Sequence, residues 1–124
     1  MPGFASLAMV NLDCTDPPAL ARFYSELLGW PVTHSQDEYA MISDGATSIG
    51  FGLVPGYQPT IWPQEPAPKR YHLDFYVDDL DRAEALCLGL GATKPHAQPE
   101  PERWRVLIDP SGQPFDICAR PEAG

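Results

Sequence analysis

The spacing of apolar residues predicts one helix among several extended segments in the first half of the chain. After Asp16, apolar side chains recur every three or four positions, which predicts a helix over residues 17–28. Asp16 suits the N-cap of this helix, and Gly29 suits the left-handed residue at its end. The remaining apolar or alternating stretches predict four strands, at residues 7–12, 31–34, 39–43 and 48–54. We therefore predict a βαβββ unit spanning residues 6–54.

The same order of elements recurs in the second half. Residues 55–70 contain five prolines, which suit neither a central strand nor a helix interior, so this segment is predicted to be a connector. Asp79 then precedes a helix that ends near Gly91. Strands are predicted at residues 71–77, 93–97, 104–108 and 114–118. The predicted fold class is α+β, with a second βαβββ unit over 71–118 in a single domain spanning 1–124. A chance recurrence of these signals is the alternative.

Alternation along four of the predicted strands separates apolar from polar residues. Side chains of successive strand residues point to opposite faces of a sheet, so each strand sorts into two sets. One set is mostly apolar and is expected to pack on the two helices. The other set contains Met9, Asn11, Gly52, His72, Asp74, Tyr76 and Asp116. We interpret this second face as the lining of a pocket; an antiparallel sheet with one solvated face would alternate in the same way without binding a ligand.

Composition limits the classes of partner. The formal net charge is −9 and the sequence pI is about 4.5, so neither nucleic acid nor an anionic membrane surface is an expected partner. The three cysteines show no CxxC spacing, which suits neither a disulfide framework nor a structural zinc site. The short N-terminal apolar run lacks a basic leader and meets Asn11 and Asp13, which disfavours a secretory signal or a membrane span. We expect a cytoplasmic protein.

Three segments resemble the vicinal oxygen chelate superfamily, in its glyoxalase-like and bleomycin-resistance branch. They are LDCTDPPALARFYSELLGW, HLDFYVDDLDRAEALCLGLGAT and VLIDPSGQPFDIC. The resemblance implies that the paired units curl into a half-open barrel. In metal-using members, one residue from each of four strands holds a divalent cation. Those positions fall here on Met9, Gly52, His72 and Asp116.

The residues at the four family positions disfavour a metal cofactor. The Met9 thioether is a soft donor that suits hard or borderline cations poorly, and Gly52 has no side chain. Only His72 and Asp116 remain as ligands, so we expect no metal and no other cofactor. A weak site completed by water or substrate oxygens remains open.

The expected function is metal-independent binding that sequesters a planar aromatic small molecule, such as an antibiotic. Trp62 in the connector and Trp104 offer stacking surfaces, and the polar side chains would orient the ligand. The predicted ligand-binding residues are Met9, Asn11, Gly52, Trp62, His72, Asp74, Tyr76, Trp104 and Asp116. The resemblance further implies a homodimer with pockets at the subunit interface. The alternatives are a glyoxalase-like lyase or isomerase with a degenerate metal site, a metal-free catalyst using His72 with Asp116, and an interaction module without a small ligand.

Overall fold

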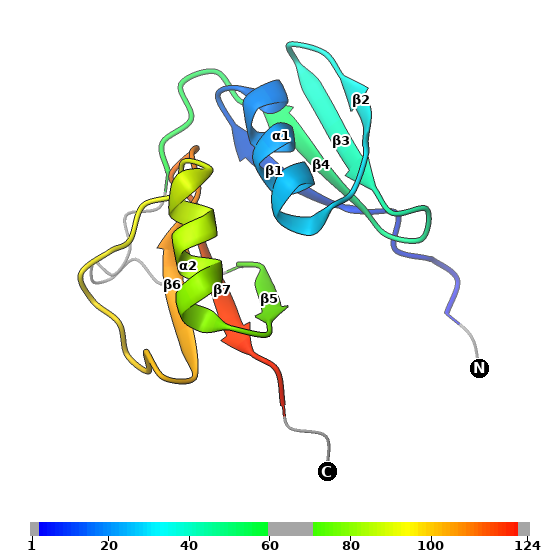
Figure 1. Cartoon of the computed structure of the whole chain (residues 1–124). Coiled ribbons are helices and arrows are strands. Elements are labelled where there is room, and N and C mark those ends of the chain that lie inside the picture. Colours follow the sequence, from blue (N-terminus) through cyan, green and yellow to red (C-terminus); the bar gives the residue numbers. More distant parts are fainter. Residues whose placement is uncertain (1–2, 60–70, 122–124) are drawn as a thin grey trace. The chain divides into compact units, whose positions relative to one another are not determined.

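The computed structural model describes residues 3–59 and 71–121. The chain divides into two compact units, Met1–Tyr57 and Gln58–Gly124, called unit 1 and unit 2 below. The division falls within the predicted connector of residues 55–70. Each unit carries its own helix and sheet, and each is described by itself (Figure 1).

Unit 1 has the predicted βαβββ order. Its elements are β1 (Val10–Cys14), α1 (Pro17–Leu28), β2 (Val32–Ser35), β3 (Tyr39–Ser43) and β4 (Ser48–Leu53). The strands lie in the order β1-β4-β3-β2, with β1 parallel to β4 and the other neighbours antiparallel. The strand predicted at residues 7–12 is displaced, because regular pairing begins at Val10 opposite Ile49.

Helix α1 coincides with the predicted range, and its ends explain why. The Asp16 carboxylate accepts a hydrogen bond from the Ala19 backbone N–H at 3.2 Å, and Gly29 adopts the left-handed conformation with φ of 73°. Between these ends, the apolar stripe is buried against the sheet. The rings of Tyr24 and Phe51 stack at 5.8 Å between centroids. The core of unit 1 therefore lies between α1 and the sheet.

Unit 2 begins with the same strand and helix order. Its elements are β5 (Asp74–Val77), α2 (Leu80–Gly89), β6 (Trp104–Ile108) and β7 (Pro114–Ala119). The sheet order is β5-β7-β6, with β5 parallel and β6 antiparallel to β7. Asp79 caps α2 by accepting from the Arg82 backbone N–H at 3.1 Å. Neither α1 nor α2, the helices of the described residues, is long and apolar enough to cross a membrane.

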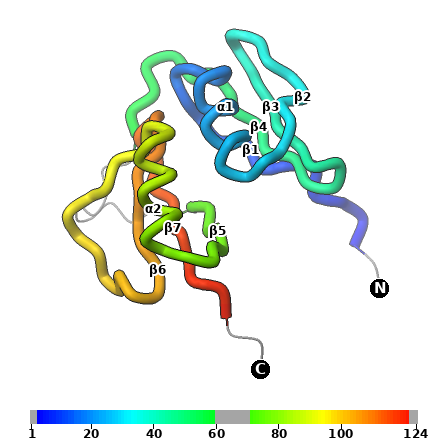
Figure 2. The backbone as a smooth tube through the Cα atoms, in the orientation of Figure 1, coloured from blue at the N-terminus to red at the C-terminus, as the bar shows by residue number. Residues whose placement is uncertain are grey.

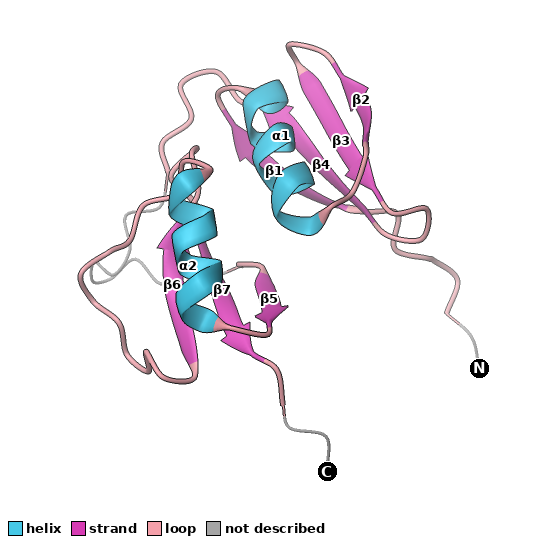
Figure 3. Cartoon of the chain, viewed as in Figure 1, coloured by secondary structure: helices cyan, strands magenta, loops and turns pink. Residues whose placement is uncertain are grey.

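The strand predicted at residues 93–97 is wrong in extent. Only Thr93 pairs, in an isolated bridge with Ile108, and the chain then runs as a loop to β6 (Figures 2 and 3). Prolines at positions 95, 99 and 101 prevent a continued ladder, since proline lacks the backbone N–H. The predicted strand over 71–77 is likewise shortened, and its regular part begins at Asp74.

The side chain of Gln98 takes the place of the missing strand. Its amide oxygen accepts from the Val106 N–H at 2.9 Å, and its amide nitrogen donates to the Val106 carbonyl at 2.9 Å and to the Pro95 carbonyl at 3.0 Å. One side chain thereby satisfies both backbone groups of a buried residue in β6.

The position of Arg105 identifies the face of the unit 2 sheet that α2 covers. Its guanidinium lies 2.9 Å from the Asp81 carboxylate and 3.4 Å from the Glu84 carboxylate, both on α2. Because side chains alternate along a strand, Trp104 and Val106 lie on the opposite face of β6. We call this the outer face of unit 2.

Candidate functional site

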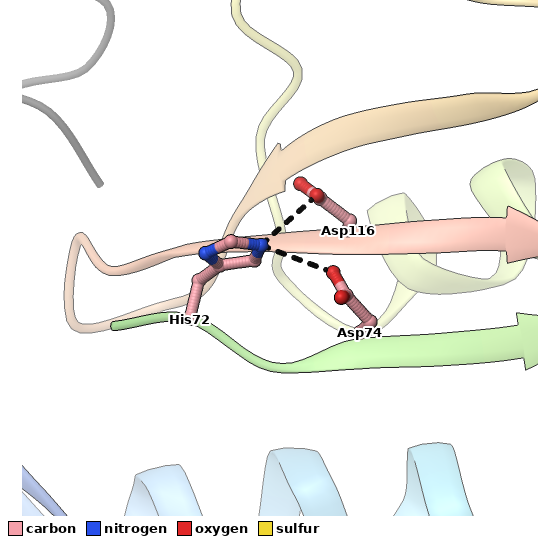
Figure 4. A group of neighbouring side chains, drawn as sticks. All are labelled: His72, Asp74 and Asp116. Carbon is pink, nitrogen blue, oxygen red and sulfur yellow. Dashed lines mark ion pairs between the residues drawn. The ribbon is translucent and has the colours of Figure 1, made fainter. Parts of the chain in front are cut away.

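Three predicted residues, His72, Asp74 and Asp116, form one cluster in unit 2 (Figure 4). Asp74 of β5 and Asp116 of β7 are register partners in neighbouring parallel strands, so their side chains share a face. His72 lies two residues before Asp74, ahead of the regular part of β5, and its imidazole contacts both carboxylates. The Asp116 N–H donates to the Leu73 carbonyl at 2.9 Å, which ties this segment to β7.

The His72 imidazole lies between the two carboxylates. Its Nε2 atom is 3.1 Å from Asp74 Oδ1 and 3.3 Å from Asp116 Oδ2. The Asp116 side chain is only 8% exposed, whereas that of Asp74 is 59% exposed. A single Nε2–H can be aligned with only one of two carboxylates at a time. The cluster therefore combines a nearly buried acceptor with an accessible one.

The cluster also resembles a partial set of ligands for a cation. One ligand atom from each of the three residues lies within 4.8 Å of the others. Imidazole nitrogen and carboxylate oxygen suit borderline and hard divalent cations. These three donors all belong to unit 2 and include Asp74, which is not a family ligand position.

The four family positions do not suit the divalent cation that metal-using members of the family hold. In unit 1 the Met9 sulfur accepts a hydrogen bond from the Tyr39 hydroxyl at 3.1 Å, and Gly52 supplies no side chain. A four-strand ligand set is therefore incomplete in this chain, and we derive no catalytic step through it.

Two aromatic residues flank a small one on the outer face of unit 2. Tyr76 of β5, Cys118 of β7 and Trp104 of β6 are successive register partners, so their side chains lie in one row across the sheet. Tyr76 is exposed, while Cys118 and Trp104 are half-buried. We call these three residues the aromatic row. The next row along the same strands contains Asp74 and Asp116.

The predicted residues of unit 1 lie on the face of its sheet opposite α1. Asn11 is the register partner of Gly50, and Tyr39 is the partner of Gly52. A Cβ atom at Gly52 would meet nothing within 4 Å, so the expected space is present there. At Gly50 the space is filled by the side chains of Asn11 and Tyr39.

Tyr39 is a site candidate that the sequence patterns alone did not single out. Alternation in β3 places Tyr39 and Met41 opposite the buried Ala40 and Ile42, which is the same signal that selected Asn11. The imidazole of His34, in the neighbouring strand, lies 5.6 Å from the Tyr39 ring. Trp62 lies outside the described residues.

Comparisons with known proteins agree on one family. The chain matches the model of the glyoxalase-like domain over residues 9–118. It is 31% identical over 113 residues to "Putative glyoxylase CFP32" of Mycobacterium bovis and Mycobacterium tuberculosis. That match covers 83% of this chain but 40% of the relative, so the chain spans less than half of the relative's length.

Solved structures show the same fold. A glyoxalase/bleomycin resistance protein/dioxygenase family enzyme from Burkholderia phytofirmans is similar at 25% identity and a TM-score of 0.67, over 93% of this chain and 98% of that one. A bleomycin-binding protein solved with bleomycin is similar at 20% identity and a TM-score of 0.56, over 94% and 100%.

Proposed function

Since this chain belongs to the glyoxalase-like domain family, we propose that it binds a planar aromatic small molecule on the outer face of unit 2. The observation that carries this proposal is the aromatic row, in which Tyr76 and Trp104 flank Cys118 beside the carboxylates of Asp74 and Asp116. A bleomycin-binding neighbour of the same fold supports a binding role.

The spacing of the row suits a flat ring. Neighbouring strands lie about 4.8 Å apart, so Tyr76 and Trp104 are rooted about 10 Å apart. A ring in van der Waals contact on both faces needs about 7 Å between its walls. The side chain between the two aromatic residues, that of Cys118, is small.

The polar cluster would orient the ligand. Asp74 is exposed and offers carboxylate oxygens to a donor group, and His72 is held by Asp116 behind it. The other residues predicted to bind the ligand are not used in this proposal, because Met9, Asn11 and Gly52 belong to unit 1 and Trp62 lies outside the described residues. In this proposal the protein sequesters its ligand, which is the basis of resistance by drug binding, and acts as a homodimer with pockets at the subunit interface.

Equilibrium dialysis against bleomycin and riboflavin tests the proposal. Replacing Tyr76 or Trp104 by alanine should weaken binding of the preferred compound by about fivefold or more, because each removes a stacking partner worth about 1 kcal/mol. Tyr71→Ala is the matched control, since Tyr71 is an exposed tyrosine of the same unit outside the row. Unchanged affinity in both row variants, or equal losses in the control, would exclude the aromatic row as the site.

A second function, cation-assisted catalysis of the glyoxalase type, is favoured by one observation. The three donor atoms of His72, Asp74 and Asp116 lie close enough together to bind one divalent ion. A bound cation would supply Lewis-acid polarisation of a substrate oxygen. Titration of EDTA-treated protein with Mn²⁺ or Ni²⁺ by calorimetry distinguishes the two functions.

Stoichiometric binding that is lost in both His72→Ala and Asp74→Asn, but kept in Asp37→Asn, would favour the catalytic function. Asp37 is an exposed carboxylate of unit 1 and serves as the control. No binding at millimolar metal would leave ligand sequestration as the proposed function.

A further inference from the structure

We propose that Asn11, Tyr39 and Met9 form a second binding site, on unit 1, for a planar group that presents an amide-like N–H and C=O edge. We call these three residues the amide site. It shares no residue with the aromatic row of unit 2, so variants of different residues test the two proposals.

Gly50 is what allows the amide site to form. A Cβ atom at Gly50 would overlap the Asn11 amide oxygen and lie 2.6 Å from the Tyr39 hydroxyl. The two side chains therefore converge over the bare backbone of β4, from β1 on one side and β3 on the other. Their polar atoms are close enough together to contact the same small group.

The polar groups of the amide site form few hydrogen bonds with other described protein groups. The Tyr39 hydroxyl donates to the Met9 sulfur at 3.1 Å, which is a weak acceptor, and keeps its own lone pairs. Within residues 3–59 and 71–121, the Asn11 side-chain amide forms no hydrogen bond. Asn11 therefore presents both a donor and an acceptor, beside a phenol oxygen that can accept.

The donor and acceptor of Asn11 and the phenol oxygen of Tyr39 indicate the class of ligand. A side-chain amide pairs best with a group that offers a donor and an acceptor side by side, as a lactam, a carboxamide or an imide does. The half-buried Met9 thioether and Tyr39 ring supply polarisable surface for the flat part of the ligand. None of the three residues of the amide site carries a charge that would select an ionic ligand at this point.

A matched pair of probes isolates the amide edge. 2-Quinolone is planar and has a lactam N–H and C=O, whereas N-methyl-2-quinolone keeps the ring and the carbonyl but lacks the N–H. We expect the unmodified protein to bind 2-quinolone about tenfold more tightly, because a methylated ligand leaves the Asn11 oxygen without its partner. Binding is followed by ¹H–¹⁵N chemical-shift changes, which also report where on the chain each probe binds.

Variants of the site give the decisive comparison. Asn11→Leu keeps a similar size but removes the amide oxygen that would accept from the lactam N–H, and it should abolish the preference between the two probes. Gly50→Ala should weaken both probes by displacing Asn11 and Tyr39. Asp13→Ala is the control, because Asp13 is an exposed residue on the same face of β1 and lies opposite Gly52.

Each outcome bears on the proposal. Loss of the preference in Asn11→Leu, with the preference in Asp13→Ala unchanged, supports the amide site. A preference that survives in Asn11→Leu, or chemical-shift changes confined to unit 2, overturns the amide site while leaving the aromatic row intact. Failure of both probes to bind the unmodified protein would overturn the amide site, while the dialysis experiment on Tyr76 and Trp104 would decide the aromatic row separately.

Discussion

At the scale of single residues, the two aspartates of the His72 cluster look alike in the sequence but differ in how far they are buried. Asp74 and Asp116 both contact His72 through one oxygen, yet one is mostly exposed and the other nearly buried. An exposed ion pair contributes little to stability, because water solvates both charges. A buried carboxylate depends on the partners that replace its water.

This difference predicts unequal effects of two substitutions. His72→Ala should lower the free energy of unfolding by about 1–2 kcal/mol, because the buried Asp116 loses the imidazole. Asp74→Ala should change it by less than about 0.5 kcal/mol. Urea unfolding followed by circular dichroism measures both, and equal effects would contradict the assigned burial.

Cys87 predicts a pH dependence of stability. Burial, and next the charge of Glu84, raise the pKa of this thiol from 9.0 to about 11. In the unfolded chain the thiol ionises first as pH rises, so its contribution to folding is full below pH 9 and falls between about pH 9 and 11. Cys87→Ala lacks this titration.

Urea unfolding at pH 8 and pH 10.5 tests this sign. The stability advantage of the unmodified protein over Cys87→Ala should shrink at the higher pH, since all other groups are common to both proteins. An advantage that grew with pH would show that the thiolate, and not the thiol, is favoured in the folded chain.

At the scale of elements, unit 2 differs from unit 1 in the proline-containing segment that follows α2, where a loop replaces a strand. Thr93 starts a strand that the prolines at 95, 99 and 101 do not allow to continue. Gln98 then supplies with its side chain the hydrogen bonds that a strand would supply with its backbone. A loop can therefore occupy the edge of β6 without leaving buried backbone groups unsatisfied.

Gln98→Ala should cost on the order of 1–3 kcal/mol, because it leaves the N–H and C=O of buried Val106 without these partners. Gln36→Ala is the matched control, since its exposed side chain lies in a unit 1 turn held by backbone hydrogen bonds. Thermal unfolding compares the two. Amide hydrogen exchange at Val106 should accelerate only in Gln98→Ala.

At the scale of the whole molecule, the chain belongs to the glyoxalase-like domain family, and we propose that it forms a homodimer. The match to the glyoxalase-like domain confirms the resemblance inferred from three motifs, and the neighbours confirm the α+β fold. Each unit has a helix on one face of its sheet and candidate binding residues on the other. Binding on those faces is compatible with pockets that a second copy of the chain completes.

The proposed homodimer predicts a sedimentation mass of twice the 13.6 kDa of the chain. Equilibrium sedimentation at micromolar concentration measures it directly. The acidic net charge of −9 opposes association at low ionic strength, so raising the salt concentration should stabilise a dimer. A monomer mass at all salt concentrations would exclude the dimer.

The elements of this fold were predictable where local chemistry determines them. Asp16 and Gly29 set the ends of α1, and alternation in β7 separates Asp116 from Phe115 and Ile117. These signals depend on neighbours in sequence, so the residues themselves carry them. The acidic composition likewise disfavours a nucleic-acid partner whatever the fold, because phosphate binding needs clustered basic side chains.

Tertiary structure alone decided which residues meet. The register of β5 with β7 brings Asp74 beside Asp116, and the register of β7 with β6 brings Trp104 into line with Cys118 and Tyr76. The convergence of Asn11 and Tyr39 over Gly50 depends on three strands being paired. Alternation specifies the face of a side chain but not its cross-strand partner, because register is a long-range property.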